Sequence, residues 1–483
     1  MHFSIPDTQE FIDTTGNSYV GYNIHINGLF HCTVRYKQLL NLHEQLIKNM
    51  DVMLPSFPPK KFFPLTANQQ EDRRLCLEKY IQTIGQNPAI NNSKLLNGFL
   101  LNAQQETFSR MMESVDLSVF LMDNQKLTLK VSTDENSQKV LEKVCKLINL
   151  PRNYESYFCL FIITKTGDNN IDILRKLHDF ESPVLTMDNI NQYEKQIVVG
   201  KNYWDITNDL KLIQNPISLN LLYIQAIAEV DRGWIIVPNQ LKTHLNSLKE
   251  EENKVEYLKL VSTFKYYGYL QFKMCYCDYP EPGTKVIVSI GGHELNLRIY
   301  IDDEEHEAMF KVTRMRCWRI TTLQNGFDKK EDPNNFSLEL SFEYLVAKNQ
   351  LQWITISSEQ AILMSVCLQS MIDELLLKHV HNPNKNNQMS DKSWTYVTRD
   401  GHSRVIVSSG LPDDIDNVQK DKPIQDSNAS DLVIKKFSDR FSSSMKTKKT
   451  GDVKNLTKIN PKGTSSCDIM ENNAFHMIGD DDL

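Results

Sequence analysis

Residues 34–40 read VRYKQLL and place an arginine, a tyrosine and a lysine where an expected strand passes into an expected helix. Before them, YVGYNIHING (19–28) and LFHCTVRY (29–36) alternate between apolar and polar residues, and an Asn-Gly pair, the commonest short hairpin signal, joins them. After them, one helix face is predicted to carry Leu39, Leu42, His43 and Leu46. The chain therefore opens with a hairpin that leads into an amphipathic helix.

Basic residues recur at three spaced points of this region. They are Arg35 with Lys37, Lys60 with Lys61 in FPPKKFFPL (57–65), and Arg73 with Arg74 in EDRRLCLEKY (71–80). A phosphoinositide head group needs a bidentate arginine, further cations and an aromatic face for its ring. Arg73 shares a helix stripe with apolar residues four and eight positions later, so it is expected to point inward, where a cation requires an anion.

The stretch KKFFPLT (60–66) combines two lysines with Phe62 and Phe63. Such a loop suits insertion into a lipid interface while its cations meet anionic head groups. A solvated basic face with both phenylalanines in the core is an equally good interpretation of the spacing alone.

Length, net charge and cysteine content limit the classes of protein to which the chain can belong. A chain of 483 residues predicts three to four folding units. The net charge of −7 argues against a general nucleic-acid binder. Nine cysteines without CxxC spacing favour free thiols over a disulfide framework or a metal site. The sequence has neither a signal peptide nor an apolar run of membrane-spanning length, so we expect a cytoplasmic protein.

Four further regions follow. Residues 115–200 predict two strands, a helix and returning strands, as in a ubiquitin-like unit, and residues 203–272 are mostly helical. Residues 284–378 predict several strands closed by one long helix, the layout of a pleckstrin or phosphotyrosine-binding-type barrel. From about residue 380, the composition is polar and typical of disorder.

The order RY, FPPKK and Arg-x₃-LEKY resembles the phox-homology (PX) domain across residues 1–105. The resemblance implies that this domain binds phosphatidylinositol 3-phosphate. Arg35 would hold the 3-phosphate and Tyr36 would stack on the inositol. Lys60 would meet the 1-phosphate, Arg73 the ring hydroxyls, and Lys37 would add charge.

A PX domain followed by these three lobes resembles the endosomal PX-FERM sorting nexins. The predicted fold is multidomain α+β: a PX domain, a three-lobed FERM module (ubiquitin-like, helical and PTB/PH-like barrel) and a disordered C-terminal tail. The expected boundaries are 1–108 for PX, 115–202, 203–273 and 274–380 for the FERM lobes F1, F2 and F3, and 381–483 for the tail.

A barrel edge strand beside a packed helix can bind an extended peptide by strand addition. In this family the third lobe binds NPxY and NPxF motifs of receptor tails, and the resemblance assigns the peptide groove to Trp318, Ile372 and Leu376. Core packing is the alternative, because a buried tryptophan is more often core than binding surface.

The chain ends in NNAFHMIGDDDL (472–483), which is apolar and acidic after a polar tail. Its ending resembles the family's motif for the retriever (commander) recycling complex. Independently, Asn472 to Phe475 has the spacing of NPxF and could occupy the chain's own groove. The residues assigned to retriever are Ile478, Gly479, Asp480, Asp481, Asp482 and Leu483.

Sequence motifs of common enzyme classes, such as GxxxxGK[ST], GxSxG and HExxH, are absent, so we predict no catalytic residues, cofactor or metal. The resemblance implies a monomeric adaptor that does not bind nucleic acid. It would act on the cytosolic face of early endosomes, directing receptors to recycling and away from lysosomal degradation. A FERM-type membrane–cytoskeleton or signalling scaffold is the alternative, although the tail has no coiled-coil heptads.

Overall fold

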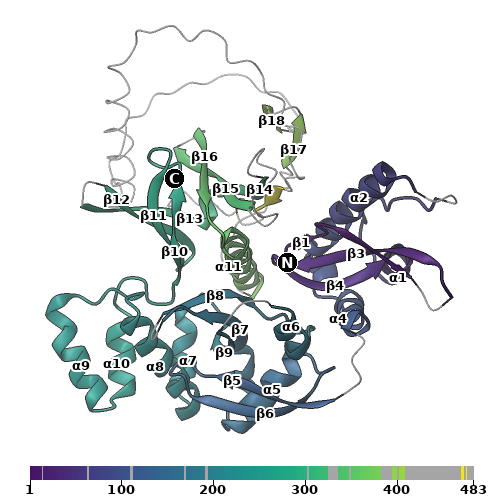
Figure 1. Ribbon diagram of the computed structural model, residues 1–483. Helices are drawn as coiled ribbons and strands as arrows, with labels where there is room; N and C mark the ends of the chain where they lie inside the picture. The colour runs from purple at the N-terminus through teal and green to yellow at the C-terminus, as the bar shows by residue number, and fades with distance from the viewer. Residues whose placement is uncertain are drawn as a thin grey trace, which may run out of the picture.

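The computed structural model in Figure 1 arranges the chain as a series of lobes. It describes all residues except 13–14, 62–64, 109–112, 168–169, 191–193, 302–303, 325–335, 348–349, 382–393, 400–401, 408–468, 473–474 and 476–483. None of the helices within these described ranges combines the length and hydrophobicity that crossing a bilayer requires.

The N-terminal domain is a small sheet covered by helices. In the sheet, β3 pairs with β1, β2 and β4. The predicted hairpin is confirmed: Asn27 and Gly28 join β3 to β4, both with positive φ, as tight hairpin turns require. The elements are β1 (Phe3–Ser4), β2 (Thr8–Ile12), β3 (Ser18–Ile26), β4 (Leu29–Arg35), α1 (Tyr36–Asn49), α2 (Ala67–Gln86), α3 (Pro88–Asn91) and α4 (Lys94–Phe108).

The F1 lobe is a five-stranded sheet in the order β6-β5-β9-β7-β8, with β5 and β9 parallel, so the ubiquitin-like arrangement is confirmed. Its helix α5 begins at Ser137 because the Asn136 side chain accepts the Lys139 amide. The elements are β5 (Ser114–Phe120), β6 (Lys126–Ser132), α5 (Ser137–Leu147), η1 (Arg152–Tyr157), β7 (Phe158–Lys165), β8 (Ile171–Lys176), α6 (Pro183–Asn189) and β9 (Lys195–Lys201).

The F2 lobe is helical, as predicted. Its main helix, α8, has Asn215 as N-cap and Pro216 in its first turn, and Gly233 follows its end with positive φ. The elements are η2 (Ile206–Asn208), α7 (Asp209–Leu212), α8 (Pro216–Asp231), η3 (Asn239–Leu241), α9 (Lys242–Glu250) and α10 (Lys254–Val261).

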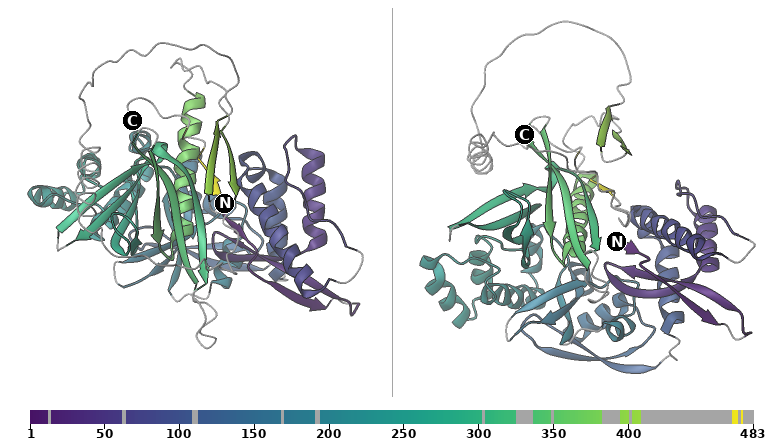
Figure 2. Two further views of the ribbon diagram at one scale, coloured as in Figure 1. Left: turned by 90° about the horizontal axis from the view of Figure 1, so that it is seen from above. Right: turned by 45° about the horizontal axis from the view of Figure 1, so that its top comes forward.

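The F3 lobe curls a continuous sheet around one long helix, α11, which Figure 2 shows against the strands. The strand order is β13-β12-β11-β10-β16-β15-β14-β19. The inner face of α11 and both halves of the sheet share one core. The elements are β10 (Leu270–Cys277), β11 (Thr284–Gly291), β12 (Glu294–Ile301), β13 (Glu304–Lys311), η4 (Val312–Arg314), β14 (Met315–Gln324), β15 (Phe336–Ala347), β16 (Gln350–Ser357) and α11 (Ala361–His381).

The region beyond α11, expected to be disordered, contains three short strands among its described residues. β17 (Trp394–Arg399) and β18 (His402–Val407) pair with each other, whereas β19 (Ile469–Glu471) pairs with β14. The edge of β14 offers unpaired backbone groups, which a passing segment can satisfy by adding one more strand.

The PX domain and F1 share a buried interface. Phe180, from the F1 segment between β8 and α6, joins the PX core and makes an edge contact with His31. A hydrogen bond of 2.9 Å joins Asn27 Nδ2 to His178 Nε2. Beneath them, burial would raise the pKa of Glu181, but its bidentate pairing with Arg175 at 2.5 Å lowers that pKa to about 2. Through this interface the PX domain packs directly against the F1 lobe.

Candidate lipid-binding and peptide-binding sites

The PX candidate residues begin at the junction of β4 and α1. Arg35 is exposed, with extended backbone angles, and it precedes the first turn of α1. Tyr36, which follows it, is half-buried and donates a 2.8 Å hydrogen bond to the carbonyl of Pro58. That bond ties the proline-rich loop to α1 two residues before Lys60, which is exposed. The hydrogen bond therefore brings the loop that carries Lys60 to the start of α1, which Arg35 directly precedes.

The third basic point of the sequence, Arg73, lies on α2. Its guanidinium carbon lies 4.5 Å from the centroid of the Tyr36 ring. Its Nη2 is buried and has no hydrogen-bond partner. An unsatisfied buried donor on a charged group is costly, so this nitrogen requires an acceptor. An anionic or hydroxylated ligand would supply one.

The neighbouring Arg74 has a different environment. It pairs with Glu71 at 2.6 Å and with Glu78 at 3.5 Å, so its charge is neutralised within the domain. Lys37 is exposed in the first turn of α1. The two candidate membrane-inserting residues, Phe62 and Phe63, lie outside the described residues.

An aromatic cluster supports the proline-rich loop, and the sequence reasoning missed it. Phe57 stacks on His43 with centroids 4.9 Å apart and meets Tyr80 edge-on, also at 4.9 Å. It also lies 5.6 Å from the Tyr36 ring. One member of the cluster could be predicted from the sequence, because His43 belongs to the predicted inner face of the first helix. This cluster fixes the loop that carries Lys60.

The candidate F3 groove is the edge of β14 beside α11, and residues of the chain's own tail pair with this edge. β19 is antiparallel to β14, with Cys317 opposite Glu471, Trp318 opposite Met470 and Arg319 opposite Ile469. Figure 2 shows this strand, in yellow, beside the end of the sheet. The edge therefore accepts an extended segment by strand addition.

Asn472, directly after β19, makes the most specific contacts. It is 3% exposed, and its Nδ2 donates to the carbonyls of Val312 at 2.7 Å and Met315 at 2.6 Å. Its backbone amide donates to the Arg316 carbonyl at 3.1 Å. The Phe475 amide then donates to the Asn472 carbonyl at 3.0 Å and closes a turn. The segment thus forms an extended strand, a buried asparagine and a turn that ends in an aromatic residue.

The three residues predicted for the groove belong to the F3 core or pack against it, and their role in peptide binding stays a prediction. Trp318 is 0% exposed, and its indole Nε1 donates to the hydroxyl of Ser365 on α11 at 2.9 Å. Ile372 is buried in the same core, and Leu376 packs against it. Both lie on the face of α11 that carries Ser365, seven and eleven residues further along. The polar contacts to the tail segment come from the backbone of β14 and from carbonyls near η4, which have no side-chain signature.

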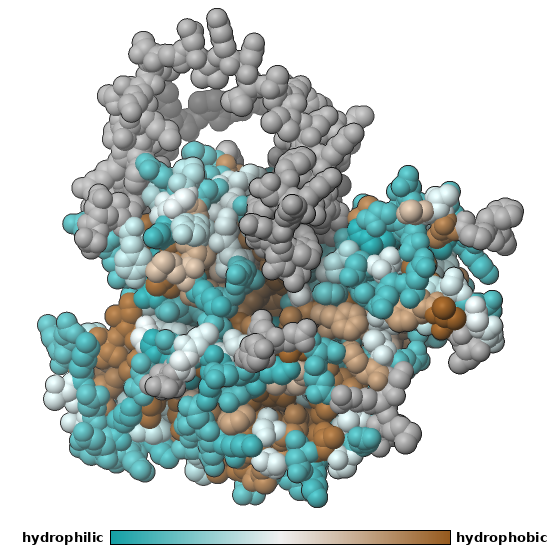
Figure 3. Space-filling model, viewed as in Figure 1, coloured by the Kyte–Doolittle hydropathy of each residue, from teal (hydrophilic) through white to brown (hydrophobic). Residues whose placement is uncertain are grey.

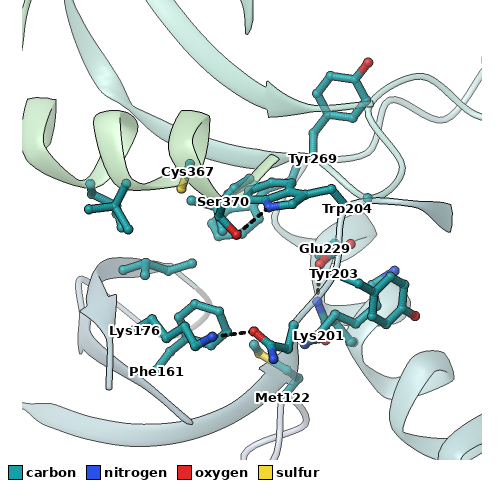
Figure 4. A pocket seen from close by; sticks show the side chains of 18 of the residues that line it. Met122, Phe161, Lys176, Lys201, Tyr203, Trp204, Glu229, Tyr269, Cys367 and Ser370 are labelled. Atoms are coloured by element: carbon teal, nitrogen blue, oxygen red, sulfur yellow. Dashed lines mark hydrogen bonds between the residues drawn. The ribbon is translucent and has the colours of Figure 1, made fainter. Parts of the chain in front are cut away.

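The opposite face of α11 lines a separate cavity of about 100 Å³ at the junction of the three FERM lobes. Figure 4 shows Trp204 donating to Ser370 across it, at 3.1 Å, and Lys176 beside Phe161. Val366 and Cys367 also line it. This cavity lies between the lobes and is distinct from the peptide groove. The six predicted retriever-binding residues, Ile478 to Leu483, lie outside the described residues.

Family models match the chain over four consecutive ranges. The PX domain model matches residues 22–103. The F1 lobe of the sorting nexin 17/27/31 FERM domain matches 115–204, and the F2 lobe of sorting nexin 17/31 matches 205–265. The Sorting Nexin 17 FERM C-terminal domain matches 268–376.

Full-length relatives extend this result. Sorting nexin-17 of Danio rerio is 40% identical over 495 residues, which cover 100% of both chains. Sorting nexin-17 of Homo sapiens is 40% identical over 493 residues, again covering 100% of both. Sorting nexin-31 of Homo sapiens is 33% identical and covers 78% of this chain and 86% of its own. The chain therefore belongs to the sorting nexins, as a PX-FERM homologue of sorting nexin-17.

Proposed function

We propose that this protein is a non-catalytic endosomal cargo adaptor. Its PX domain binds phosphatidylinositol 3-phosphate on the cytosolic face of early endosomes. Its F3 lobe binds NPxY and NPxF motifs of transmembrane receptors. Through retriever and commander, it directs these receptors to recycling and away from lysosomal degradation.

One observation carries the peptide-binding part of the proposal: the chain's own tail segment seated on β14. The pairing of β19 and the buried Asn472 together reproduce what an NPxF peptide would need from this edge. A receptor tail with the same spacing presents the same asparagine and an aromatic residue three positions later. Unphosphorylated tyrosine or phenylalanine is the expected ligand residue.

The lipid-binding part rests on the cluster of Arg35, Tyr36, Lys60 and Arg73. The unsatisfied Nη2 of Arg73 and the exposed charges of Arg35 and Lys60 suit a ring that carries phosphates and hydroxyls. Ile12, an apolar residue that is 76% exposed at the end of β2, suits the same membrane-facing role. Figure 3 shows hydrophobic surface at this outer end of the PX domain.

The tail has two roles in this scheme. While Asn472 occupies the F3 groove, the segment competes with receptor motifs. Displacement by a receptor frees the tail, whose last residues, Ile478 to Leu483, resemble the family's retriever-binding ending. Membrane and receptor contacts that are weak alone become strong together, because binding one raises the effective concentration of the other.

A matched pair of peptides tests the groove. An NPxF peptide is expected to bind the protein, whereas its Asn→Asp counterpart, of nearly equal size, should bind at least about tenfold more weakly. The reason is that Val312 and Met315 present carbonyl oxygens, which attract an amide N–H and repel a carboxylate. Titration calorimetry measures both affinities. Equal affinities would show that these carbonyls do not distinguish asparagine from aspartate in the peptide.

A further inference from the structure

The side chain of Arg35, the candidate phosphate ligand, packs against an aromatic residue. Its guanidinium carbon lies over the ring of Tyr19, in β3, 3.3 Å from the ring centroid, so the guanidinium is in direct contact with the ring face. Among the described residues, no carboxylate lies within ion-pair distance of Arg35. The tyrosine ring is thus the group that holds this side chain in place.

Tyr19 is itself held by Phe11 across the β2–β3 ladder. The two residues are directly opposite, and their rings stack with centroids 5.5 Å apart and an angle of 17°. The Phe11 ring covers the backbone of Gly21, where an added Cβ would lie 2.6 Å from it. Gly21 in turn pairs with Arg35 on β4. The missing side chain at Gly21 lets Phe11 lie flat over β3 and support Tyr19.

The backbone of Arg35 is fixed from the other side. Its amide donates to Gln38 Oε1 at 2.7 Å, and Gln38 Nε2 donates to Glu106 on α4 at 2.7 Å. The residue is therefore anchored at its main chain by α1 and α4 and at its guanidinium by Tyr19.

We infer that Tyr19 is a positioning residue for phosphoinositide binding, which acts by orienting Arg35. This inference rests on the proposed lipid-binding function. A guanidinium that stacks on an aromatic ring contacts the ring through its own flat face. Its N–H donors lie in the guanidinium plane and therefore point outward from the edge. Those donors are then free for two oxygens of one phosphate, and the side chain has less rotamer freedom left to lose on binding.

The test uses soluble dibutanoyl phosphatidylinositol 3-phosphate, titrated into the full-length protein by calorimetry. Tyr19→Leu keeps an apolar contact with Phe11 but removes the aromatic face, so we expect affinity to fall about two- to fivefold. Tyr19→Phe keeps the face and should bind like the wild type. Tyr276→Leu, the same change at an exposed tyrosine of the F3 strand β10, should leave this affinity unchanged.

The outcomes separate the possible failures. Equal affinity of Tyr19→Leu and wild type would overturn the positioning role while leaving the lipid-binding proposal intact. Weak binding by Tyr19→Phe as well would also overturn it, because the effect would then not depend on the ring face. Failure of the wild type to bind the ligand would instead reject the proposed lipid-binding function. The affinity for an NPxF peptide and the thermal midpoint verify that each variant is folded.

Discussion

Arg35→Ala is expected to lower the affinity of the protein for vesicles containing phosphatidylinositol 3-phosphate by about a hundredfold. The estimate corresponds to about 3 kcal/mol, the loss of two charged hydrogen bonds to one phosphate. The side chain is exposed and makes no ion pair with the described carboxylates, so its removal should cost little folding stability. Vesicle co-sedimentation at physiological salt measures the affinity directly.

Arg152→Ala provides the matched control. Arg152 is an exposed residue of the F1 lobe, and its substitution changes the net charge by the same amount. A general electrostatic attraction to the membrane would weaken similarly in both variants, whereas a specific site is affected through Arg35 alone. Wild-type vesicle binding by Arg35→Ala would remove this residue from the lipid pocket. The affinity for an NPxF peptide should be the same in both variants.

The second large effect is expected from Asn472→Ala in the full-length chain, which should bind NPxF peptides up to about thirtyfold more tightly than the wild type. The side chain makes two hydrogen bonds to backbone carbonyls, and their loss is expected to weaken tail docking by about 2 kcal/mol. A competing peptide binds only to molecules with an open groove, so its apparent affinity rises as that fraction rises.

The converse experiment distinguishes competition from a general change in the lobe. A synthetic peptide spanning residues 466–478, added to Asn472→Ala protein, should lower the apparent affinity for an NPxF peptide. The same synthetic peptide carrying the Asn472→Ala change should have a much weaker effect. If Asn472→Ala leaves NPxF affinity unchanged, the tail does not limit access to the groove in solution.

The chain's local patterns predicted most of the fold. Asn27-Gly28 determined the first hairpin, and the apolar face with Leu39, Leu42 and Leu46 is buried as expected. Most strands and helices of F1 and F3 followed from alternation and helical spacing, whereas β8, α6 and β10 were not predicted. The family resemblance, confirmed by full-length relatives, supplied the arrangement of the lobes.

The contacts between distant segments could not be predicted in this way. Nothing local in residues 469–471 reveals their register on β14, because that register depends on an edge some 150 residues earlier in the chain. The carbonyls that receive Asn472 belong to the backbone and have no residue signature. The stacking of Arg35 on Tyr19 depends on the Phe11–Gly21 packing, which periodicity does not encode.

Trp318 shows where residue type alone is ambiguous. The sequence allowed either a groove wall or a core position, and the structure buries its side chain completely with the indole N–H bonded to Ser365. Truncating such a residue typically costs about 3–5 kcal/mol of folding free energy. Trp318→Ala would therefore test the stability of F3 as much as its peptide affinity, and Asn472 is the better position for testing the groove.

The central claim is that one protein binds a phosphoinositide membrane and a receptor motif at the same time. Vesicle flotation tests this claim most directly. Four vesicle preparations are compared: plain, with phosphatidylinositol 3-phosphate, with a lipid-anchored NPxF peptide, and with both. Because the two sites lie on one chain, we predict that the doubly decorated vesicles recruit far more protein than the sum of the singly decorated ones. Recruitment by the double preparation that does not exceed that sum would contradict the adaptor function.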